Sequence, residues 1–299
     1  MAQPVFRFAP SPNGDLHLGH AYSALLNLQL ARSMDAKMLL RIEDIDPVRC
    51  TPERERQMLC DLEWLGFEWD EAPQRQSERI DEYRNIIEQL EQEELVYPTT
   101  ASRGEIKKQI EEIQISGVDW PHDPDGVPHY PGSERDAPLQ ERNALKNGPK
   151  PCSFRLDTAK ALSRINRPLF WTETGFGRDM LSQDIPCQPK QWGDVLLGRK
   201  DFPASYHLAC VLDDAGQEIS HVVRGKDLYH ATSIHRTLQE LLNLPAPLYH
   251  HHELILDEDG NKLSKSRQDT SLRDLRQSGV TAEEIRERLF SDAGYSSPD

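Results

Sequence analysis

The sequence predicts an α/β fold whose core is a doubly wound parallel sheet, and three observations support this. A short apolar run at residues 5–9 is followed by a segment with helical spacing and then by a second apolar run at 38–42. Strand, helix and strand in this order form the βαβ unit of a parallel sheet. Both runs end in polar clusters, and strand character returns at residues 153–156 and again after residue 193. Since ligands of such sheets bind beyond the carboxyl ends of the strands, we expect the functional site there.

The remaining elements follow from hydrophobic spacing. Leu18, Ala21, Leu25 and Leu28 form an apolar stripe that predicts a first helix over residues 17–34. Amphipathic helices rich in Glu and Arg are predicted at 52–66 and 77–96, and from about 98 to 150 Pro, Gly, Asp and His dominate, which indicates an inserted domain. Later strands are predicted at 153–156, 194–197, 208–212 and 219–223, followed by a helix at 231–243 and one or two short helices up to residue 290.

Composition and length set broad limits on the class of protein. A chain of 299 residues can form two domains and bury a large core. No apolar run approaches the roughly 20 residues that span a bilayer, and residues 1–7 do not have the pattern of a signal peptide. We therefore expect a cytoplasmic protein with no membrane partner. Five cysteines without a paired spacing favour reduced thiols over disulfides or a zinc site.

The net charge of −15 argues at first against a nucleic-acid partner, because phosphate binding depends on Lys and Arg. The charges are unevenly distributed, however. Residues 43–96 hold 17 acidic and 6 basic side chains, whereas residues 141–200 hold 11 basic and 6 acidic ones. The second segment is where we expect an RNA contact, with an ordinary solvated surface as the alternative.

The turn after the first strand contains the first candidate site. Residues 10–20 read Pro-Ser-Pro-Asn-Gly-Asp-Leu-His-Leu-Gly-His and lead into the first helix. A helix N-terminus offers unpaired backbone N–H groups and partial positive charge, which suit phosphate. His17 and His20 lie on one face of the first turn and can donate to phosphate oxygens, and Gly19 lets a base or ribose approach the backbone. The alternative is a turn with two surface histidines.

A second candidate phosphate site lies near the C-terminus. Lys262-Leu263-Ser264-Lys265-Ser266 follows Asp-Gly-Asn in a polar loop. Lysines in a mobile loop can offset the charge that develops on departing pyrophosphate, and they serve best when the loop closes only over bound ATP. An exposed basic loop is the alternative.

Together, in this order, the two motifs resemble the HIGH and KMSKS signatures of class I aminoacyl-tRNA synthetases. Segments 7–11, 41–46, 206–209, 211–214 and 221–228 narrow the resemblance to the glutamyl-tRNA synthetases, closely over 5–96 and 192–266 and loosely between them. The resemblance implies a Rossmann-type parallel sheet with an inserted α+β domain and a short C-terminal helical stem. The expected segments are the first half of the core with the HIGH-like motif at 1–97, an inserted connective and acceptor-binding domain at 98–192, the second half of the core at 193–250, and the lysine loop with the stem at 251–299.

The resemblance also implies ATP-dependent activation of glutamate. Residues matching Arg7, Tyr206 and Arg224 hold the amino acid in that family, chiefly by its side-chain carboxylate, and the residue matching Glu43 takes the α-ammonium. The chemistry agrees, because a dicarboxylic amino acid needs cationic forks and one acid. The expected glutamate-binding set is Arg7, Phe8, Ala9, Pro10, Ser11, Glu43, Tyr206 and Arg224. The expected ATP-binding set is His17, Gly19, His20, Lys262 and Lys265, of which His17, His20 and Lys265 are expected to be catalytic.

Each of these residues also has a structural interpretation. Arg7 and Glu43 could form a surface ion pair, and Tyr206 could be a core aromatic residue with a satisfied hydroxyl group. Arg224 directly follows an apolar strand, so it could be an ordinary charge at the edge of a sheet.

The acceptor of the activated glutamate is inferred from one difference between this sequence and the glutamyl-tRNA synthetases. A glutamyl-tRNA synthetase carries a large anticodon-binding region after the lysine loop, whereas only residues 267–299 follow here. This resembles the short paralogues that attach glutamate to the queuosine base in the anticodon of tRNA(Asp), so we expect a monomer that acts on queuosine-containing tRNA(Asp). The alternatives are a truncated synthetase that charges the 3′ end of tRNA(Glu), a small-molecule adenylyltransferase, or a non-enzymatic synthetase-like RNA-binding protein.

Metal is expected only as the Mg²⁺ that accompanies ATP as substrate. Family members often bind zinc through closely spaced cysteines in the insertion, but the matching segment 97–103 has none, so no structural zinc is expected. His122, Asp123 and His129 are interpreted as scattered surface residues. The consecutive histidines at 250–252 cannot all face one ion on a strand, and a solvated or packing role is expected for them.

Overall fold

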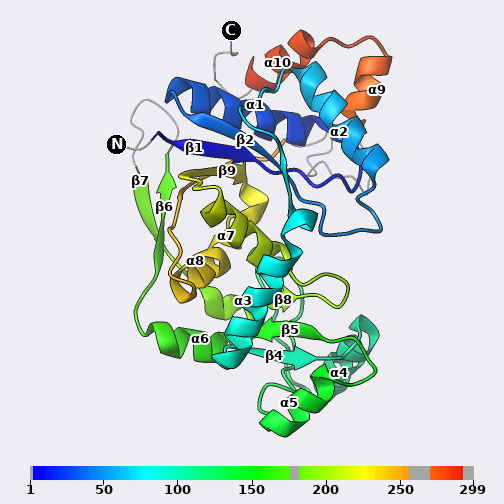
Figure 1. The fold of residues 1–299 in the computed structure, drawn as a ribbon, viewed down its shortest axis with the longest axis vertical. Coiled ribbons are helices and arrows are strands. Elements are labelled where there is room, and N and C mark those ends of the chain that lie inside the picture. The colour runs from blue at the N-terminus through cyan, green and yellow to red at the C-terminus, as the bar shows by residue number, and fades with distance from the viewer. Residues whose placement is uncertain (1–2, 176–181, 256–269, 292–299) are drawn as a thin grey trace.

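The computed structural model describes residues 3–175, 182–255 and 270–291 of the chain (Figure 1). Two sheets organise it, one of seven strands in the order β3-β2-β1-β9-β10-β6-β7 and one of three in the order β4-β5-β8. The strands of the large sheet are β1 (Val5–Phe8), β2 (Lys37–Ile42), β3 (Gln74–Arg75), β6 (Phe170–Thr174), β7 (Ser182–Pro186), β9 (His221–Gly225) and β10 (Leu248–His252).

All neighbours in the large sheet are parallel except β7, which pairs antiparallel with β6 at one edge. The predicted βαβ unit is confirmed: α1 (Leu18–Ser33) connects β1 to β2 and packs on both. Both faces of the central strands are covered, as a parallel sheet requires. The Rossmann-type core predicted from the sequence is therefore present.

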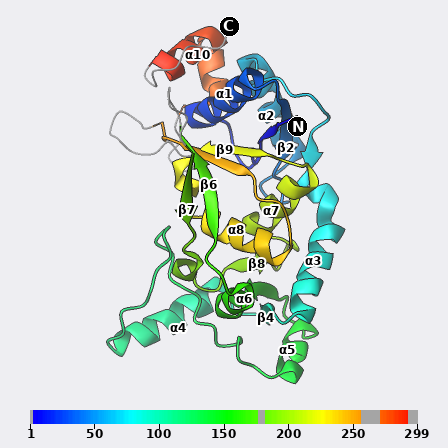
Figure 2. The same cartoon turned by 90° about the vertical axis from the view of Figure 1, so that its left-hand side faces the viewer.

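Alternating side chains assign the two faces of the large sheet. Phe6, Phe8 and Leu40 pack with α1 in one buried cluster, while Leu39 and Val222 belong to another on the opposite face. That opposite face is covered by α7 (Tyr206–Gly216) and α8 (Thr232–Leu241), which lie between the two sheets (Figures 1 and 2).

The three-stranded sheet is antiparallel and consists of β4 (Val96–Thr99), β5 (Ser153–Leu156) and β8 (Leu196–Gly198). It shares one apolar cluster with α3 (Ile80–Gln92), α6 (Thr158–Ile165), α7 and α8. α4 (Arg103–Ile115) and α5 (Leu139–Lys146) flank it (Figure 2). The segment 98–192 begins within β4 and contains β5 of this sheet as well as β6 and β7 of the large sheet, and β8 follows it.

Two short C-terminal helices, α9 (Leu272–Gln277) and α10 (Ala282–Ser291), pack beside α1 and α2 (Pro52–Leu65) (Figure 1). Leu272, Leu289 and Phe290 enter the same buried cluster as α1. An isolated bridge also joins Ser271 to His17 at the start of α1. The C-terminal helices are thus attached to the part of the core that contains the histidine motif.

One predicted strand is wrong. Residues 208–212 lie in α7, because Leu208-Ala209-Cys210-Val211-Leu212 belongs to a helix that is buried on nearly all sides between the two sheets. A short continuous apolar run does not distinguish a buried strand from a buried helix.

All five cysteines are free, as expected. No helix among the described residues has the length and apolar character needed to cross a membrane.

Candidate functional site

The register of the large sheet brings five polar side chains to one face. The strand registers place these five residues an even number of positions from one another across the sheet. They are Arg41 (β2), Arg7 (β1), Arg224 (β9), His251 (β10) and Glu173 (β6). Successive side chains of a strand point to opposite faces, so all five face α7 and α8. The carboxyl ends of parallel strands meet at one edge, and this polar row therefore lies where a ligand site of such a sheet is expected.

A cavity of about 420 Å³ opens beside this row and extends to the N-terminus of α1. Every expected site residue that the structure describes lines it, namely Arg7, Phe8, Ala9, Pro10, Ser11, His17, Gly19, His20, Glu43, Tyr206 and Arg224. The rest of the wall comes mainly from the ends of β9 and β10 and the residues after them, namely Val223, Gly225, Asp227, Leu228, His252, Leu254 and Ile255. Lys262 and Lys265 lie outside the described residues.

His17 and His20 form the N-terminal cap of α1. The Nδ1 atom of His17 accepts the backbone N–H of Gly19 at 3.1 Å, and Nδ1 of His20 accepts that of His17 at 3.2 Å. Because each Nδ1 accepts a hydrogen bond, each neutral ring carries its proton on Nε2. The rings lie together, with centroids 3.9 Å apart, and both line the cavity. The helix terminus thus presents imidazole donors as well as backbone dipoles.

Gly19 has a packing role that sequence reasoning missed. A Cβ atom at this position would lie 3.1 Å from Cε1 and 3.2 Å from Nδ1 of His17. This is closer than the ordinary contact of such atoms, so a side chain at position 19 would displace the imidazole that caps the helix. Any larger residue at position 19 would therefore shift the His17 ring by a few tenths of an ångström, so this glycine supports the position of the ring.

Arg7 and Arg41 share one buried carboxylate, and the interpretation of Arg7 and Glu43 as a surface ion pair is wrong. Asp214 Oδ1 of α7 lies 3.0 Å from Arg7 Nε and 2.8 Å from Arg41 Nη1. Burial by itself raises the pKa of Asp214, but the two guanidinium groups outweigh it and the pKa is lowered. Arg41, which is completely buried, also approaches Glu43 at 3.5 Å. Asp214 was not singled out, because no local pattern in the sequence links residue 7 to residue 214.

Glu43 follows β2 and carries a perturbed carboxyl group. Burial raises its pKa to about 7, against the opposing effect of Arg41 and Arg7. Its backbone N–H donates to Pro10 O at 3.0 Å, which ties the end of β2 to the loop after β1. An ammonium group placed against Glu43 would favour the ionised carboxylate, so this residue can take the amine of an amino acid.

Arg224 is buried in a central strand, so its interpretation as an edge charge is wrong. It donates to five acceptors: His251 Nε2 at 3.1 Å, His235 Nδ1 at 3.1 Å, Tyr206 Oη at 3.4 Å, Thr232 Oγ1 at 2.7 Å and Leu228 O at 3.2 Å. None of these acceptors is a carboxylate, in contrast to Asp214 beside Arg7. All five N–H groups of Arg224 thus have uncharged protein acceptors, and its positive charge has no carboxylate among them. A ligand carboxylate in the cavity would be attracted by this charge and would replace Tyr206, the most distant of the five acceptors, on Arg224 Nη1.

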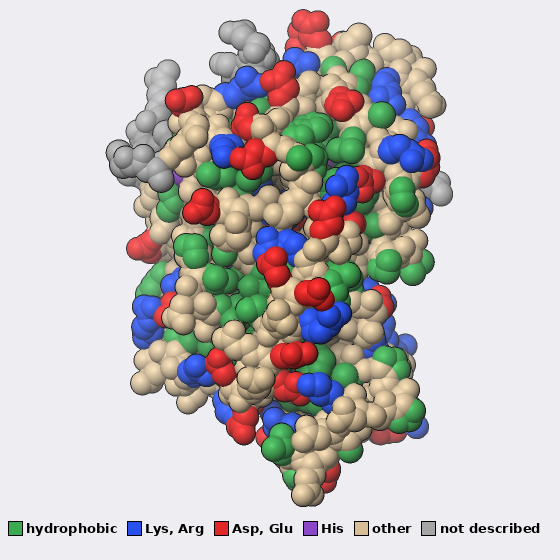
Figure 3. Space-filling view, viewed as in Figure 1, with side chains coloured by type: hydrophobic (Ala, Val, Ile, Leu, Met, Phe, Trp, Pro, Cys, Tyr) green, Lys and Arg blue, Asp and Glu red, His purple; other side chains and the backbone are tan. Residues whose placement is uncertain are grey.

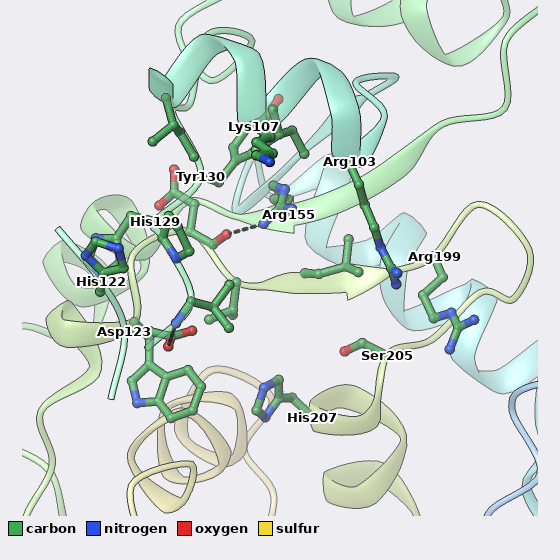
Figure 4. A pocket seen from close by; sticks show the side chains of 18 of the residues that line it. Arg103, Lys107, His122, Asp123, His129, Tyr130, Arg155, Arg199, Ser205 and His207 are labelled. Atoms are coloured by element: carbon green, nitrogen blue, oxygen red, sulfur yellow. Dashed lines mark hydrogen bonds between the residues drawn. The ribbon is translucent and has the colours of Figure 1, made fainter. Parts of the chain in front are cut away.

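A larger cavity of about 820 Å³ adjoins the first and shares Tyr206 with it. Arg103 and Lys107 of α4, Arg155 of β5 and Arg199 supply its cationic lining (Figure 4). The Arg155 guanidinium stacks 4.0 Å above the ring of Tyr130. The wall is mostly apolar, with a few convergent polar groups, which suits a flat ligand with anionic substituents.

His122, Asp123 and His129 all line this larger cavity, and His122 is exposed, so they are surface residues that gather at one cavity (Figure 4). Asp123 Oδ1 accepts the backbone N–H groups of Asp125 and Val127, and His129 Nε2 lies 2.8 Å from Gln191 O. Among the described residues no group of three or more His, Cys, Asp or Glu side chains has the arrangement of a metal site.

The histidines at 250–252 are buried, so the packing role expected for them is right and the solvated one is wrong. On the outer surface, basic and acidic side chains are interspersed over the face shown in Figure 3. No single-sign patch on that face marks an RNA contact.

Comparisons with known proteins identify the family of the chain. Residues 5–292 match the family described as class I tRNA synthetases (E and Q), catalytic domain. The chain is 42% identical over 294 residues to a glutamyl-Q tRNA(Asp) synthetase of Rhodobacter capsulatus, covering 94% of this chain and 98% of that protein. It is 35% identical to a glutamate–tRNA ligase of Prochlorococcus marinus over 98% of this chain but only 59% of the ligase. A glutamate–tRNA ligase structure from Elizabethkingia meningosepticum, in complex with its amino acid, superposes with a TM-score of 0.71 at 28% identity over 93% of this chain and 53% of that one.

Proposed function

The chain belongs to the class I tRNA synthetases of the glutamate and glutamine type, and on this premise we propose that it activates L-glutamate with ATP and transfers it to queuosine in the anticodon of tRNA(Asp). It is a ligase of the aminoacyl-tRNA synthetase type, a family that uses ATP. We also propose that it acts as a monomer in the cytoplasm, where ATP and tRNA are available.

The observation that supports glutamate activation best is the cavity that unites Arg7, Glu43 and Arg224 with the capped start of α1. Arg224, whose acceptors are all uncharged, takes the side-chain carboxylate, and Glu43 takes the α-ammonium. Arg7 completes the cationic wall, and Tyr206, which accepts from Arg224, sits beside them. A site with two cations and one acid matches a dicarboxylic amino acid and disfavours glutamine, which would leave Arg224 without a charge partner.

In the first step an oxygen of the glutamate α-carboxylate attacks the α-phosphorus of MgATP. A new P–O bond forms while the bond from that phosphorus to the bridging oxygen breaks, and pyrophosphate leaves with the electron pair. The Nε2–H groups of His17 and His20 and the N-terminus of α1 stabilise the developing negative charge. Lys265 is proposed to assist the departure of pyrophosphate. Positioning and electrostatics suffice, and no side chain acts as a nucleophile.

In the second step a hydroxyl oxygen of the RNA attacks the glutamyl carbonyl carbon, the acyl–phosphate bond breaks, and AMP leaves with the electron pair while its phosphate takes the hydroxyl proton. The acceptor enters through the larger cavity, which reaches the glutamate cavity at Tyr206 and carries Arg103 and Arg155 for RNA phosphates. Queuosine as the acceptor is supported by the relative named glutamyl-Q tRNA(Asp) synthetase, which is more similar to this chain than the glutamate–tRNA ligase of Prochlorococcus marinus.

Two assays test this proposal. Pyrophosphate exchange with ATP and glutamate measures activation alone, and labelled glutamate is then offered to queuosine-containing tRNA(Asp), queuosine-free tRNA(Asp) and tRNA(Glu). We expect exchange, and label only on the queuosine-containing tRNA. Label on tRNA(Glu) alone would support 3′-end charging instead, and an absence of exchange would support a non-enzymatic RNA-binding protein.

A matched pair of variants links the activity to the cavity. Arg224→Gln removes the charge that faces the carboxylate and should reduce kcat/KM for glutamate by roughly a hundredfold or more. Arg236→Gln removes a guanidinium that pairs with Glu240 on α8, away from the cavity. Equal activity of the two variants would contradict the assignment of Arg224.

A further inference from the structure

Two chains of hydrogen bonds hold Arg224, one on each side, and the proposed reaction steps do not involve them. On one side His251 Nε2 accepts Arg224 Nε–H at 3.1 Å, and on the other His235 Nδ1 accepts Arg224 Nη1–H at 3.1 Å. Arg224 is 5% exposed, His251 7% and His235 1%, so water cannot replace these contacts. A guanidinium has donors only, so both imidazole nitrogens must be unprotonated acceptors.

This requirement fixes the tautomer of His251. With Nε2 accepting from Arg224, the ring proton sits on Nδ1, and Nδ1–H donates to Glu173 Oε2 at 2.7 Å. The other oxygen, Oε1, accepts the backbone N–H of the same residue at 2.7 Å. Each of the two carboxylate oxygens of Glu173 thus accepts one N–H group of His251. A carboxylate can accept both, whereas an amide has one oxygen and one donor group.

The second chain runs through His235 to His207. With Nδ1 of His235 accepting from Arg224, its proton sits on Nε2, which donates to His207 Nδ1 at 3.2 Å. His207 then carries its own proton on Nε2 and lines the larger cavity (Figure 4). The chain therefore crosses the wall between the two cavities.

Neutral rings are a condition of this arrangement. An imidazolium has protons on both nitrogens, so it could not accept from Arg224 and would repel it. Burial lowers the pKa of His207 to about 4, with the charge of Arg224 adding to the effect. Burial also lowers the pKa values of His251 and His235, although the hydrogen bond to Glu173 partly opposes this for His251. The rings of His251, His235 and His207 are therefore neutral at physiological pH, and their hydrogen-bond partners set their tautomers.

We propose that Glu173 with His251, and His207 with His235, are two pairs of positioning residues that orient Arg224 towards the side-chain carboxylate of the substrate. They act by fixing which imidazole nitrogen accepts, so that the guanidinium keeps one orientation without a carboxylate of its own beside it. A direct Asp or Glu partner would hold Arg224 equally well but would neutralise the charge that the substrate needs. This inference rests on the proposed binding of glutamate.

Glu173→Gln is the first test, measured by pyrophosphate exchange. The amide presents its NH₂ group either to the ring or to the backbone N–H of His251, so the ring loses its preference for Nδ1–H. We expect KM for glutamate to rise about tenfold, with KM for ATP and Tm close to wild type, and discrimination against glutamine to fall. Asp184→Asn is the matched control, because Asp184 lies in β7, which pairs with the strand of Glu173, and among the described residues it accepts from Thr172 alone, at 2.8 Å on the exposed side.

His207 provides a second test that includes a rescue. His207→Phe removes the acceptor of His235 Nε2–H and should also raise KM for glutamate about tenfold. His207→Asn places an amide oxygen near the former position of Nδ1 and should restore most of the affinity. Equal KM values for glutamate in wild type, Glu173→Gln and His207→Phe would overturn the inference. A parallel rise in KM for ATP with a fall in Tm would overturn it too, since that is the signature of general structural damage.

The tautomers give a readout that does not depend on activity. Long-range ¹H–¹⁵N spectra of histidine-labelled wild-type protein should show His251 as the Nδ1–H tautomer and His235 and His207 as Nε2–H tautomers, assigned by single variants. A ring of His251 protonated on Nε2 would overturn the inference while leaving the proposed function intact. A wild-type protein without glutamate-dependent exchange would overturn the proposed function and with it the role of Arg224, whatever the tautomers show.

Discussion

Replacing Asp214 by Asn isolates the buried charge that Arg7 and Arg41 share. The carboxylate lies 3.0 Å from Arg7 Nε and 2.8 Å from Arg41 Nη1, and its side chain is 6% exposed. An amide oxygen can still accept from one guanidinium, but the buried cluster gains a net positive charge. Removing one partner of a buried ion pair costs about 3–5 kcal/mol, and because the unfolding entropy of a chain of this size is about 0.6 kcal/mol/K, Tm should fall by roughly 5–8 °C.

Urea unfolding of Asp214→Asn and wild type at neutral pH measures this free energy, with Asp201→Asn as the control. Asp201 binds Arg199 through both oxygens but is half exposed, so its loss should cost less than about 1 kcal/mol. The pKa of Asp214 is lowered from its ordinary value of 3.8, so its charge stabilises the fold above that pH and the contribution is lost as pH falls through the folded-state pKa. The two proteins should therefore converge in acid. A deficit below about 1 kcal/mol at neutral pH, or one that persists in acid, would refute the reasoning.

Three further predictions concern single residues of the site and its support. KM for glutamate should rise as pH falls from about 8 to 6, because burial raises the pKa of Glu43 to about 7 and a protonated carboxyl group cannot pair with ammonium. In exchange kinetics of Glu43→Gln, KM for glutamate should not show this rise. Gly19→Ala should reduce kcat for exchange more than tenfold without lowering Tm, because the new Cβ displaces His17 while alanine favours the helix; a normal kcat would contradict the capping argument. Tyr83→Phe should cost about 2 kcal/mol in urea unfolding, because its hydroxyl donates to buried Asp213 at 2.9 Å; unchanged stability would show that Asp213 is satisfied without it.

The elements and residues that local patterns encode were predictable. The βαβ unit at residues 5–42 combines two apolar runs with a helical stripe, and each signal spans enough residues to be specific. Most of the residues that line the smaller cavity lie near the carboxyl ends of β1, β2 and β9 or in the loops after them, and the rule that ligands bind beyond strand ends places them together. The strand predicted at 208–212 was wrong because the signal was too short: five apolar residues fit a buried strand and a buried helix equally well.

The partners of the site residues were not predictable from the sequence alone. Arg7 and Asp214 are 207 positions apart, and their contact exists only because α7 covers the face of the sheet that carries Arg7. His251 lies in a run of three histidines, and nothing in that run indicates that the middle one contacts Arg224 while its neighbours bind the carbonyl groups of Thr174 and Glu253. Long-range charge pairs and ring tautomers depend on tertiary packing, which local periodicity does not report.

One face of the large sheet carries Arg41, Arg7, Arg224, His251 and Glu173, and this arrangement limits which insertions and deletions the site can tolerate. Deleting one residue from the first half of β1, β9 or β10 would turn the functional side chain of that strand towards α1, on the far side of the sheet. Both sides of these strands are buried, so the deletion would place a charged or polar side chain in the apolar cluster around α1. We therefore expect single-residue indels within these strands to abolish folding and activity together, whereas loops that do not line the cavity can change length with the site intact.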